Sequence, residues 1–225
     1  MEYYILKKST EKNIIGSEYP QIQTMGGTVN RDADDSLYNV YSNKFPDFIP
    51  NLNYFIVESK SILTDVLSAS MISFGFIVND KVKNIFEQHK LPPHKFYPAT
   101  VQYNAKFYNN YYWFFFVSDV LNFVDYDKTS FFITDMIGEK IEDCKETKTA
   151  NSLTNLKEVL PDDRDINSDL IIFKKEIIEK YDIFKIGFGD YYTFASKKIA
   201  DNLINANITG FRILSTKKIQ TEKSR

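Results

Sequence analysis

The stretch FIVNDKVKNIFEQHKLPPHKFYP, residues 76–98, predicts a strand, a capped helix and a second strand. Asn79 suits the N-cap, because its side-chain oxygen can accept a hydrogen bond from the free amides of the first turn. Four residues then recur at i, i+3, i+4 and i+7 on one helical face: Val82, Ile85, Phe86 and His89. Pro92 and Pro93 end the helix, since proline has no amide hydrogen and clashes with the preceding turn. Residues 94–102 are expected to form the second strand.

A second stretch, FASKKIADNLINANITGFRI at residues 194–213, repeats this pattern. In an alignment without gaps, Ser196 takes the place of the cap Asn79. The apolar face matches as well, in the pairs Val82 and Ile199, Phe86 and Leu203, and Leu91 and Ile208. Beyond the helix, Phe96 is expected to correspond to Phe211, with the two prolines as an excess in the first copy. The match favours either an internal duplication or the convergence of two capped helices.

Short strands are predicted through the rest of the chain. Residues 111–117 form a continuous apolar run whose length fits a strand buried on both faces. Asn109 and Asn110 before it predict the turn of a hairpin. Residues 2–8 are expected to form an edge strand. Further strands are expected at 37–41, 54–57, 72–78, 120–124, 130–134, 170–173, 183–186 and 191–194, a short helix or turn at 61–69, a loop at 139–151, a strand or short helix at 155–160 and an acidic turn at 161–167.

Together these elements predict an α+β fold, with a mostly antiparallel sheet and two or more packed helices. The main α+β domain is expected at residues 61–215. Residues 1–60 show little periodicity and are expected to form an irregular, strand-rich segment packed on that domain. The charged tail at residues 216–225 is expected to fray.

Composition limits the class of function. The 225 residues are 43% hydrophobic, with 19 Phe and 15 Tyr, and can build a sizeable core. A net charge of −2 gives no basic footprint, which disfavours nucleic-acid binding. The single cysteine, Cys144, excludes an internal disulfide and a cysteine-based zinc site. With no apolar stretch that suits a signal peptide or the ~18 residues of a membrane-spanning helix, we expect a cytoplasmic protein outside the membrane.

The sequence contains no catalytic constellation, and we expect no enzyme activity, metal or cofactor. His89 and His94 stand on either side of the two prolines, which is not a metal-ligand spacing, so packing or surface roles are expected. Residues 163–167 match the first half of a calcium loop. Ser168 then replaces the required glycine, and Lys174 stands where the bidentate glutamate belongs.

An acidic segment is the first candidate for contact with a protein partner, should that partner be basic. Its carboxylates are Glu158, Asp162, Asp163, Asp165 and Asp169. The alternative is an ordinary solvated loop, which is what such charge runs usually form.

The order of features from about Ile62 to Leu214 resembles a family of immunity proteins from bacterial polymorphic toxin systems, once catalogued as a domain of unknown function. Four pieces carry the resemblance: the helix start at residues 77–82, the FYPA strand at residues 96–99, the D-x-x-S turn at residues 127–130 and the ITGFRI end at residues 208–213. They span roughly two thirds of the chain. Asn79 departs from the family, where serine is more usual.

The resemblance implies a cytoplasmic inhibitor that binds a cognate toxin, without catalysis or cofactor, and it does not identify the toxin. Two alternatives remain. An uncharacterised small enzyme would need a deep pocket with convergent polar groups near Asp125, Asp127 or His94. A structural or interaction module would need a large exposed apolar patch. The sequence predicts no oligomeric state.

Overall fold

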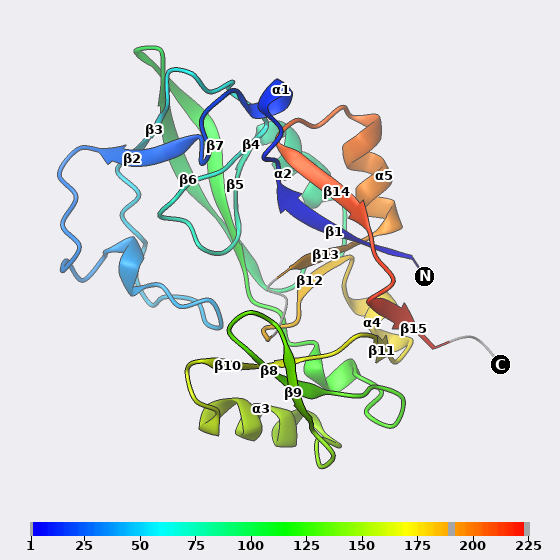
Figure 1. Ribbon diagram of the computed structural model, residues 1–225. Coiled ribbons are helices and arrows are strands. Elements are labelled where there is room, and N and C mark those ends of the chain that lie inside the picture. The colour runs from blue at the N-terminus through cyan, green and yellow to red at the C-terminus, as the bar shows by residue number, and fades with distance from the viewer. Residues whose placement is uncertain (1, 189–191, 223–225) are drawn as a thin grey trace.

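The computed structural model describes residues 2–188 and 192–222 (Figure 1). In this part the chain is an α+β fold with mostly antiparallel strands, as predicted. The larger sheet has the strand order β2-β3-β6-β7-β5-β4, and a second sheet has the order β12-β13-β1-β14. Two smaller sheets, β10-β8-β9 and β11-β15, complete it. Figure 1 shows β8, β9, β10 and α3 gathered at the lower end of the molecule.

The helices are α1 (Lys12–Ile15), α2 (Asp80–Phe86), α3 (Ala150–Val159), α4 (Glu176–Lys180) and α5 (Lys197–Asn205). The strands of the larger sheet are β2 (Ile22–Gly26), β3 (Tyr54–Val57), β4 (Val66–Leu67), β5 (Phe76–Asn79), β6 (His94–Tyr103) and β7 (Lys106–Phe116). Those of the second sheet are β1 (Tyr3–Lys8), β12 (Ile183–Lys185), β13 (Thr193–Ser196) and β14 (Phe211–Ser215). The remaining strands are β8 (Phe132–Asp135), β9 (Lys140–Asp143), β10 (Arg164–Asn167), β11 (Ile171–Phe173) and β15 (Ile219–Thr221).

The two similar stretches of sequence adopt the same topology. β5, α2 and β6 follow one another, and both strands pair antiparallel with β7, which lies between them. β13, α5 and β14 follow one another, and both strands pair antiparallel with β1. Each unit is therefore a strand–helix–strand unit split by one antiparallel strand. The shared spatial order favours an internal duplication. The chain order of the central strand differs, since β7 follows the first unit and β1 precedes the second.

The predicted caps are present in both copies. The Asn79 side chain accepts a hydrogen bond from the Val82 amide at 3.2 Å, at the start of α2. The Ser196 hydroxyl accepts one from the Ile199 amide at 3.5 Å, at the start of α5. Each bond satisfies an amide that the helix itself leaves without a partner.

Two aspartates, which we call the crossed aspartates, link each cap to the opposite copy. Asp65 accepts a hydrogen bond from the Asn79 side-chain amide at 2.8 Å and one from the Thr209 backbone amide, also at 2.8 Å. Asp182 accepts one from the Ser196 hydroxyl at 2.8 Å and one from the Lys90 amide at 3.0 Å. Each aspartate lies 14 residues before its cap. Each copy thus ties its own cap to the segment that follows the helix of the other copy.

One detail of the predicted alignment is wrong. The two central strands pair with their neighbours at the same spacing. On β7, Tyr111 pairs with Asn79 and Phe114 with Phe96. On β1, Tyr3 pairs with Ser196 and Leu6 with Ile213. Ile213 therefore occupies the place of Phe96, and the ungapped alignment continues through the second strand. The first copy therefore has no two extra residues between its helix and its second strand. Where the first copy has proline, the second copy turns at Gly210, which has a φ of +89°.

The core where the two copies meet is apolar. Val82 and Phe86 on α2, and Ile199 and Leu203 on α5, are fully buried in one cluster. Burying one such side chain stabilises the fold by ~1.5–3 kcal/mol. The predicted strand at residues 111–117 is confirmed within β7: Trp113 packs into one cluster and Phe114 into another, so both faces are covered.

Several local predictions are wrong. β1 is not an edge strand, since it lies between β13 and β14. The turn before the apolar run is formed by Asn104 and Ala105, with φ of 50° and 62°, whereas Asn109 and Asn110 lie inside β7. A two-residue turn in which both φ angles are positive matches the right-handed twist of the two strands that it joins. Residues 37–41 and 120–124 contain single 3₁₀ turns instead of strands.

Other expectations differ from the structure where short strands form. Residues 61–69 contain β4, residues 139–151 contain β9 and the start of α3, and residues 161–167 contain β10. In the tail, Ile219 is buried and β15 pairs with β11. Part of the predicted strand at 191–194 and the end of the tail lie outside the described residues. The proposed division of the chain at residue 61 stays a prediction.

Candidate functional site

The two histidines have structural surroundings. The side chain of His89 is fully buried, with Nδ1 3.6 Å from Asp182 and Nε2 3.0 Å from the side-chain nitrogen of Asn202. Burial lowers the pKa of His89, and the Asp182 carboxylate opposes that shift. Because Asn202 donates to Nε2, the neutral ring carries its proton on Nδ1. His94 is exposed and its Nδ1 lies 2.9 Å from the Pro92 carbonyl oxygen.

Asp125, one of the groups that an enzyme hypothesis would use, belongs to a surface ion-pair network. Lys128 lies 2.6 Å from Asp125 and 2.6 Å from Glu222. The hydrogen bond from Lys128 lowers the pKa of Asp125. Among the described residues, no group of three or more His, Cys, Asp or Glu side chains is placed to hold a metal ion. In the same part of the chain, no helix has the length and apolar character to cross a membrane.

The predicted acidic segment lies on α3 and the strands that follow it. Glu158 is on α3, Asp162 and Asp163 follow in the turn, and all three are exposed. Asp165 lies on β10, where Lys157 pairs with its carboxylate at 2.7 Å. Asp169 is exposed between β10 and β11. The structure brings these groups to one region, and their contact with a partner stays a prediction.

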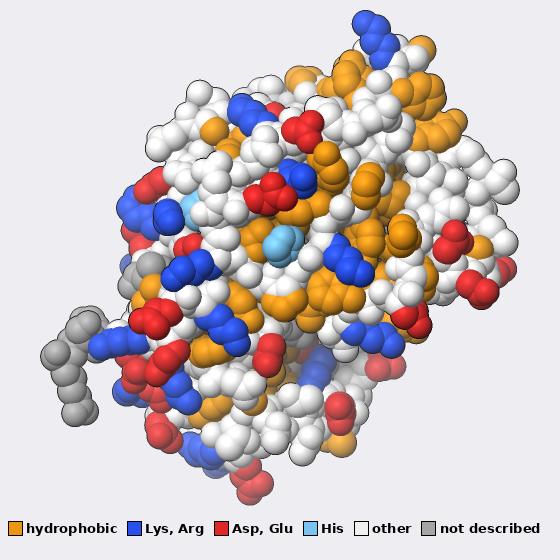
Figure 2. Space-filling model, turned by 180° about the vertical axis from the view of Figure 1, so that it is seen from behind, with side chains coloured by type: hydrophobic (Ala, Val, Ile, Leu, Met, Phe, Trp, Pro, Cys, Tyr) orange, Lys and Arg blue, Asp and Glu red, His pale blue; other side chains and the backbone are white. Residues whose placement is uncertain are grey.

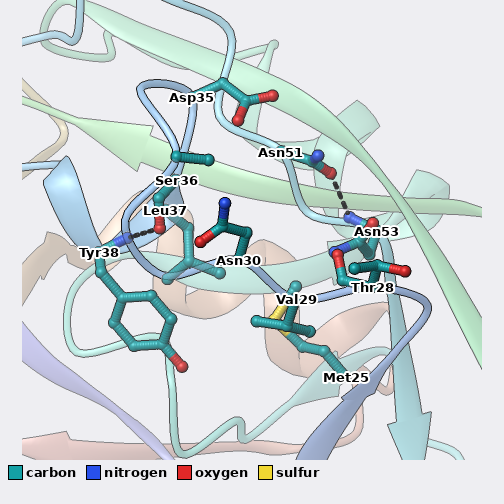
Figure 3. Close-up of a pocket in the computed structure, with 11 residues that line it drawn as sticks. Met25, Thr28, Val29, Asn30, Asp35, Ser36, Leu37, Tyr38, Asn51 and Asn53 are labelled. Atoms are coloured by element: carbon teal, nitrogen blue, oxygen red, sulfur yellow. Dashed lines mark hydrogen bonds between the residues drawn. The ribbon is translucent and has the colours of Figure 1, made fainter.

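A small pocket lies within the arm, which we define as residues 27–53 between β2 and β3. Its volume is about 40 Å³, enough for a water molecule or two. Figure 3 shows Asn30, Asn51 and Asn53 around it, with Leu37 and Met25 nearby. The Asn53 amide donates to the Asn51 side chain at 3.0 Å. Such local bonds hold the arm in shape, and the pocket is too small for a substrate.

A much larger cleft, of about 810 Å³, lies where the end of β1 meets the end of β12, the loop before β5 and the tip of the arm. We call it the lysine cleft, after Lys7, Lys8 and Lys185. Its described lining is completed by Leu6, Thr10, Tyr19, Ser42, Asn43, Ser73, Phe74, Gly75, Phe76, Val117, Ser118, Gly187, Tyr192 and Thr193. No Asp, Glu, His or Cys is among these lining residues. The volume falls within the ~300–1,000 Å³ of typical ligand pockets.

The three lysines are held in place by neutral groups. Lys8 donates a hydrogen bond to the Ile72 carbonyl oxygen at 2.9 Å. The ammonium of Lys185 lies 4.7 Å from the ring centre of Phe116, and that of Lys7 lies 3.9 Å over the ring of Tyr192. Burial lowers the pKa of Lys8 to about 8 and that of Lys185 to about 8. None of the three forms an ion pair with a residue in the described ranges.

Hydrophobic side chains also gather on the face opposite that of Figure 1. Figure 2 shows them in a band across the middle of this face, reaching the upper right corner where the β6–β7 hairpin lies. On these strands the rings of Phe96 and Tyr112 lie 6.2 Å apart, with Lys83 over both. Phe107, near the tip of the hairpin, is 55% exposed. The band is open to protein contact.

Sequence reasoning missed the lysine cleft. Lys7 and Lys8 stand at the end of the edge strand predicted at residues 2–8. Lys185 lies within the strand predicted at residues 183–186. The available signal was a lysine among apolar strand residues, since lysine is rarely buried without a partner. Only the fold brings these positions together.

The match to a family of proteins extends over nearly the whole chain. No curated protein matches the sequence. The model of the Immunity protein family (Imm11) matches residues 11–218. This range includes the four pieces on which the resemblance rested, and that resemblance is confirmed. The chain belongs to the Imm11 immunity protein family.

Proposed function

We propose that this chain neutralises a cognate bacterial toxin by stoichiometric protein–protein contact. The observation that carries the proposal is the family match over residues 11–218. The toxin belongs to a polymorphic toxin system, and the complex forms in the cytoplasm. The split strand–helix–strand units supply a rigid scaffold for such contact, because their buried cores and crossed aspartates fix the surrounding loops.

The enzyme alternative makes a different demand on the structure. It requires a pocket near Asp125, Asp127 or His94, and none of these lines the lysine cleft. The described lining of that cleft offers lysines and hydroxyl groups without a carboxylate, imidazole or thiol beside them.

Co-expression tests the proposal. The toxin encoded next to this gene is induced in a heterologous bacterium with and without the chain. Growth is expected to be rescued by the chain, and the two proteins are expected to co-purify as a complex of fixed mass ratio. An unrelated toxin of the same system is the control, and its toxicity should persist. Failure of rescue together with the absence of a complex would refute the proposal, and cell fractionation tests the cytoplasmic location.

A further inference from the structure

We propose that the lysine cleft is the receptor for an acidic segment of the toxin, which places a carboxylate between Lys8 and Lys185 and an apolar side chain on the floor of the cleft. This inference rests on the proposed function and deepens it. It identifies where the toxin is held and which chemistry is recognised.

Charge complementarity is the first argument. Three lysines line the cleft and no described lining residue carries a negative charge, although the whole chain has a net charge of −2. The described part of the lining is therefore positively charged, although the chain as a whole is not. A cleft lined by one sign of charge with apolar walls concentrates the field and attracts the opposite charge.

The state of the lysines is the second argument. Lys8 uses its ammonium for one hydrogen bond, to the Ile72 carbonyl oxygen, and an ammonium has three N–H donors. Lys185 is held over aromatic rings, with the Phe74 ring centre at 5.8 Å and the Phe116 ring centre at 4.7 Å. Burial already lowers the pKa of both side chains to about 8, so their desolvation is paid in the free protein. A carboxylate that enters gains charge-assisted hydrogen bonds to pre-positioned donors.

The apolar floor is the third argument. Leu6, Phe74, Phe76 and Val117 line the same cleft as the lysines. The ring of Phe74 also packs against Trp113 and Phe115 in the core, which keeps it in position. A volume of about 810 Å³ accepts several side chains of one segment. The preferred sequence is therefore Asp or Glu next to an aromatic or aliphatic residue.

Two other occupants are outcomes of the test. A second copy of this chain could offer its exposed carboxylates Asp162 and Asp163, in which case the free chain would self-associate. A small free anion could fill the cleft without any toxin. Either result would overturn the proposal, because neither requires an acidic segment of the toxin.

The experiment measures binding of the purified product of the neighbouring toxin gene to wild-type chain and to Lys8→Met, Lys185→Met and the double variant. Methionine keeps the length of the side chain and removes its charge, and circular dichroism checks that each variant is folded. Lys145→Met is the matched control, because Lys145 is exposed and forms no ion pair with another residue of the described ranges. The double variant is expected to weaken the Kd by about 30-fold or more and to reduce its salt dependence. The control should stay within about 2-fold of wild type.

A second measurement needs no substitution. An amine-reactive reagent labels lysines in the free chain and in the toxin complex, and mass spectrometry gives the rate at each position. Lys8 and Lys185 are expected to be protected at least about 10-fold in the complex, whereas Lys145 should label equally in both states. Overlapping synthetic peptides of the toxin should compete only where they contain Asp or Glu beside an apolar residue.

The outcomes separate this inference from the proposed function. This inference is refuted if the double variant binds the toxin with full affinity and if Lys8 and Lys185 of the wild-type complex are labelled at the rate of the free chain. That result would leave the proposed toxin binding intact. A wild-type chain that does not bind the toxin refutes the proposed function itself. A dimer of the free chain that the lysine substitutions dissociate, or saturation of the cleft by inorganic phosphate at the affinity of the toxin, assigns the cleft to another occupant.

Discussion

Replacing Asp182 with alanine is expected to destabilise the whole molecule, because this one carboxylate joins the two copies of the strand–helix–strand unit. Asp182 is only 6% exposed. It accepts hydrogen bonds from the Ser196 hydroxyl at 2.8 Å and from the Lys90 amide at 3.0 Å. Alanine leaves the amide after α2 and the cap of α5 without their shared acceptor.

The magnitude follows from the number and kind of bonds. A hydrogen bond to a charged group contributes ~1.5–3 kcal/mol, and two such bonds are lost. The release of a buried charge offsets part of the loss. The free energy of unfolding should therefore fall by about 3 kcal/mol. Asp65→Ala removes three hydrogen bonds, from the Asn79 side chain and from the amide and hydroxyl of Thr209. Asp65 is only half-buried, however, and water can replace these bonds, so a smaller loss of about 1.5 kcal/mol is expected.

Urea unfolding followed by tryptophan fluorescence measures both losses, since Trp113 lies in the core. Asp162→Ala is the control, because its carboxylate is exposed and forms no ion pair within the described part of the chain, and it should change stability by less than about 0.5 kcal/mol. Burial works to raise the pKa of Asp65, but hydrogen bonds from Thr209 and Asn79 outweigh it and lower the pKa. The Asp65 contribution is thus present above pH ~4 and lost as the pH falls through the lowered pKa. An Asp182→Ala variant as stable as the control would refute the crossed link.

The stability of the free chain should rise between pH 7 and 9, because folded Lys8 and Lys185 lose their protons near pH 8, while the unfolded chain keeps them up to a pKa of 10.5. The free energy of unfolding should rise by about 1 kcal/mol for each lysine. Urea unfolding of Lys185→Met at the two pH values should show a rise that is smaller by the contribution of Lys185. A rise of unchanged size would contradict the burial of that ammonium. Gly75 has φ +74° and an added Cβ would meet the Phe114 carbonyl, so Gly75→Ala should cost roughly 3 kcal/mol or more. Gly138→Ala is the matched control, because Gly138 has a φ of +88° and an added Cβ would meet nothing within 4 Å, and it should cost only about 1 kcal/mol. Equal losses of stability in thermal melts would show that the positive φ, and not the contact with the Phe114 carbonyl, sets the cost.

The parts of the fold that sequence predicts are those set by neighbours along the chain. The caps Asn79 and Ser196 and the apolar face of each helix follow from spacing within a few residues, and the structure confirms them. The buried run in β7 is equally local, because a continuous apolar strand must be covered on both faces. The repeat of the pattern near the C-terminus left duplication and convergence as alternatives.

The remaining parts depend on partners far away in the chain. β1 contains the same polar end as an edge strand, yet β13 and β14 cover both its sides from the other terminus. The strands β4 and β10, of two and four residues, are too short to show an alternating pattern, and pairing with β5 and β8 fixes them. The lysine cleft combines the two ends of the chain, so no window of sequence contains it.

The most direct test of toxin neutralisation by binding is a titration of the chain into the purified toxin, with heat and toxin activity recorded together. Binding should saturate at a fixed stoichiometric ratio, and activity should disappear at the same point. The toxin released from the complex by denaturation and refolding should have unchanged mass and full activity. Inactivation by a small fraction of an equivalent, or a toxin recovered with altered covalent mass, would contradict stoichiometric inhibition and show that the chain acts as an enzyme.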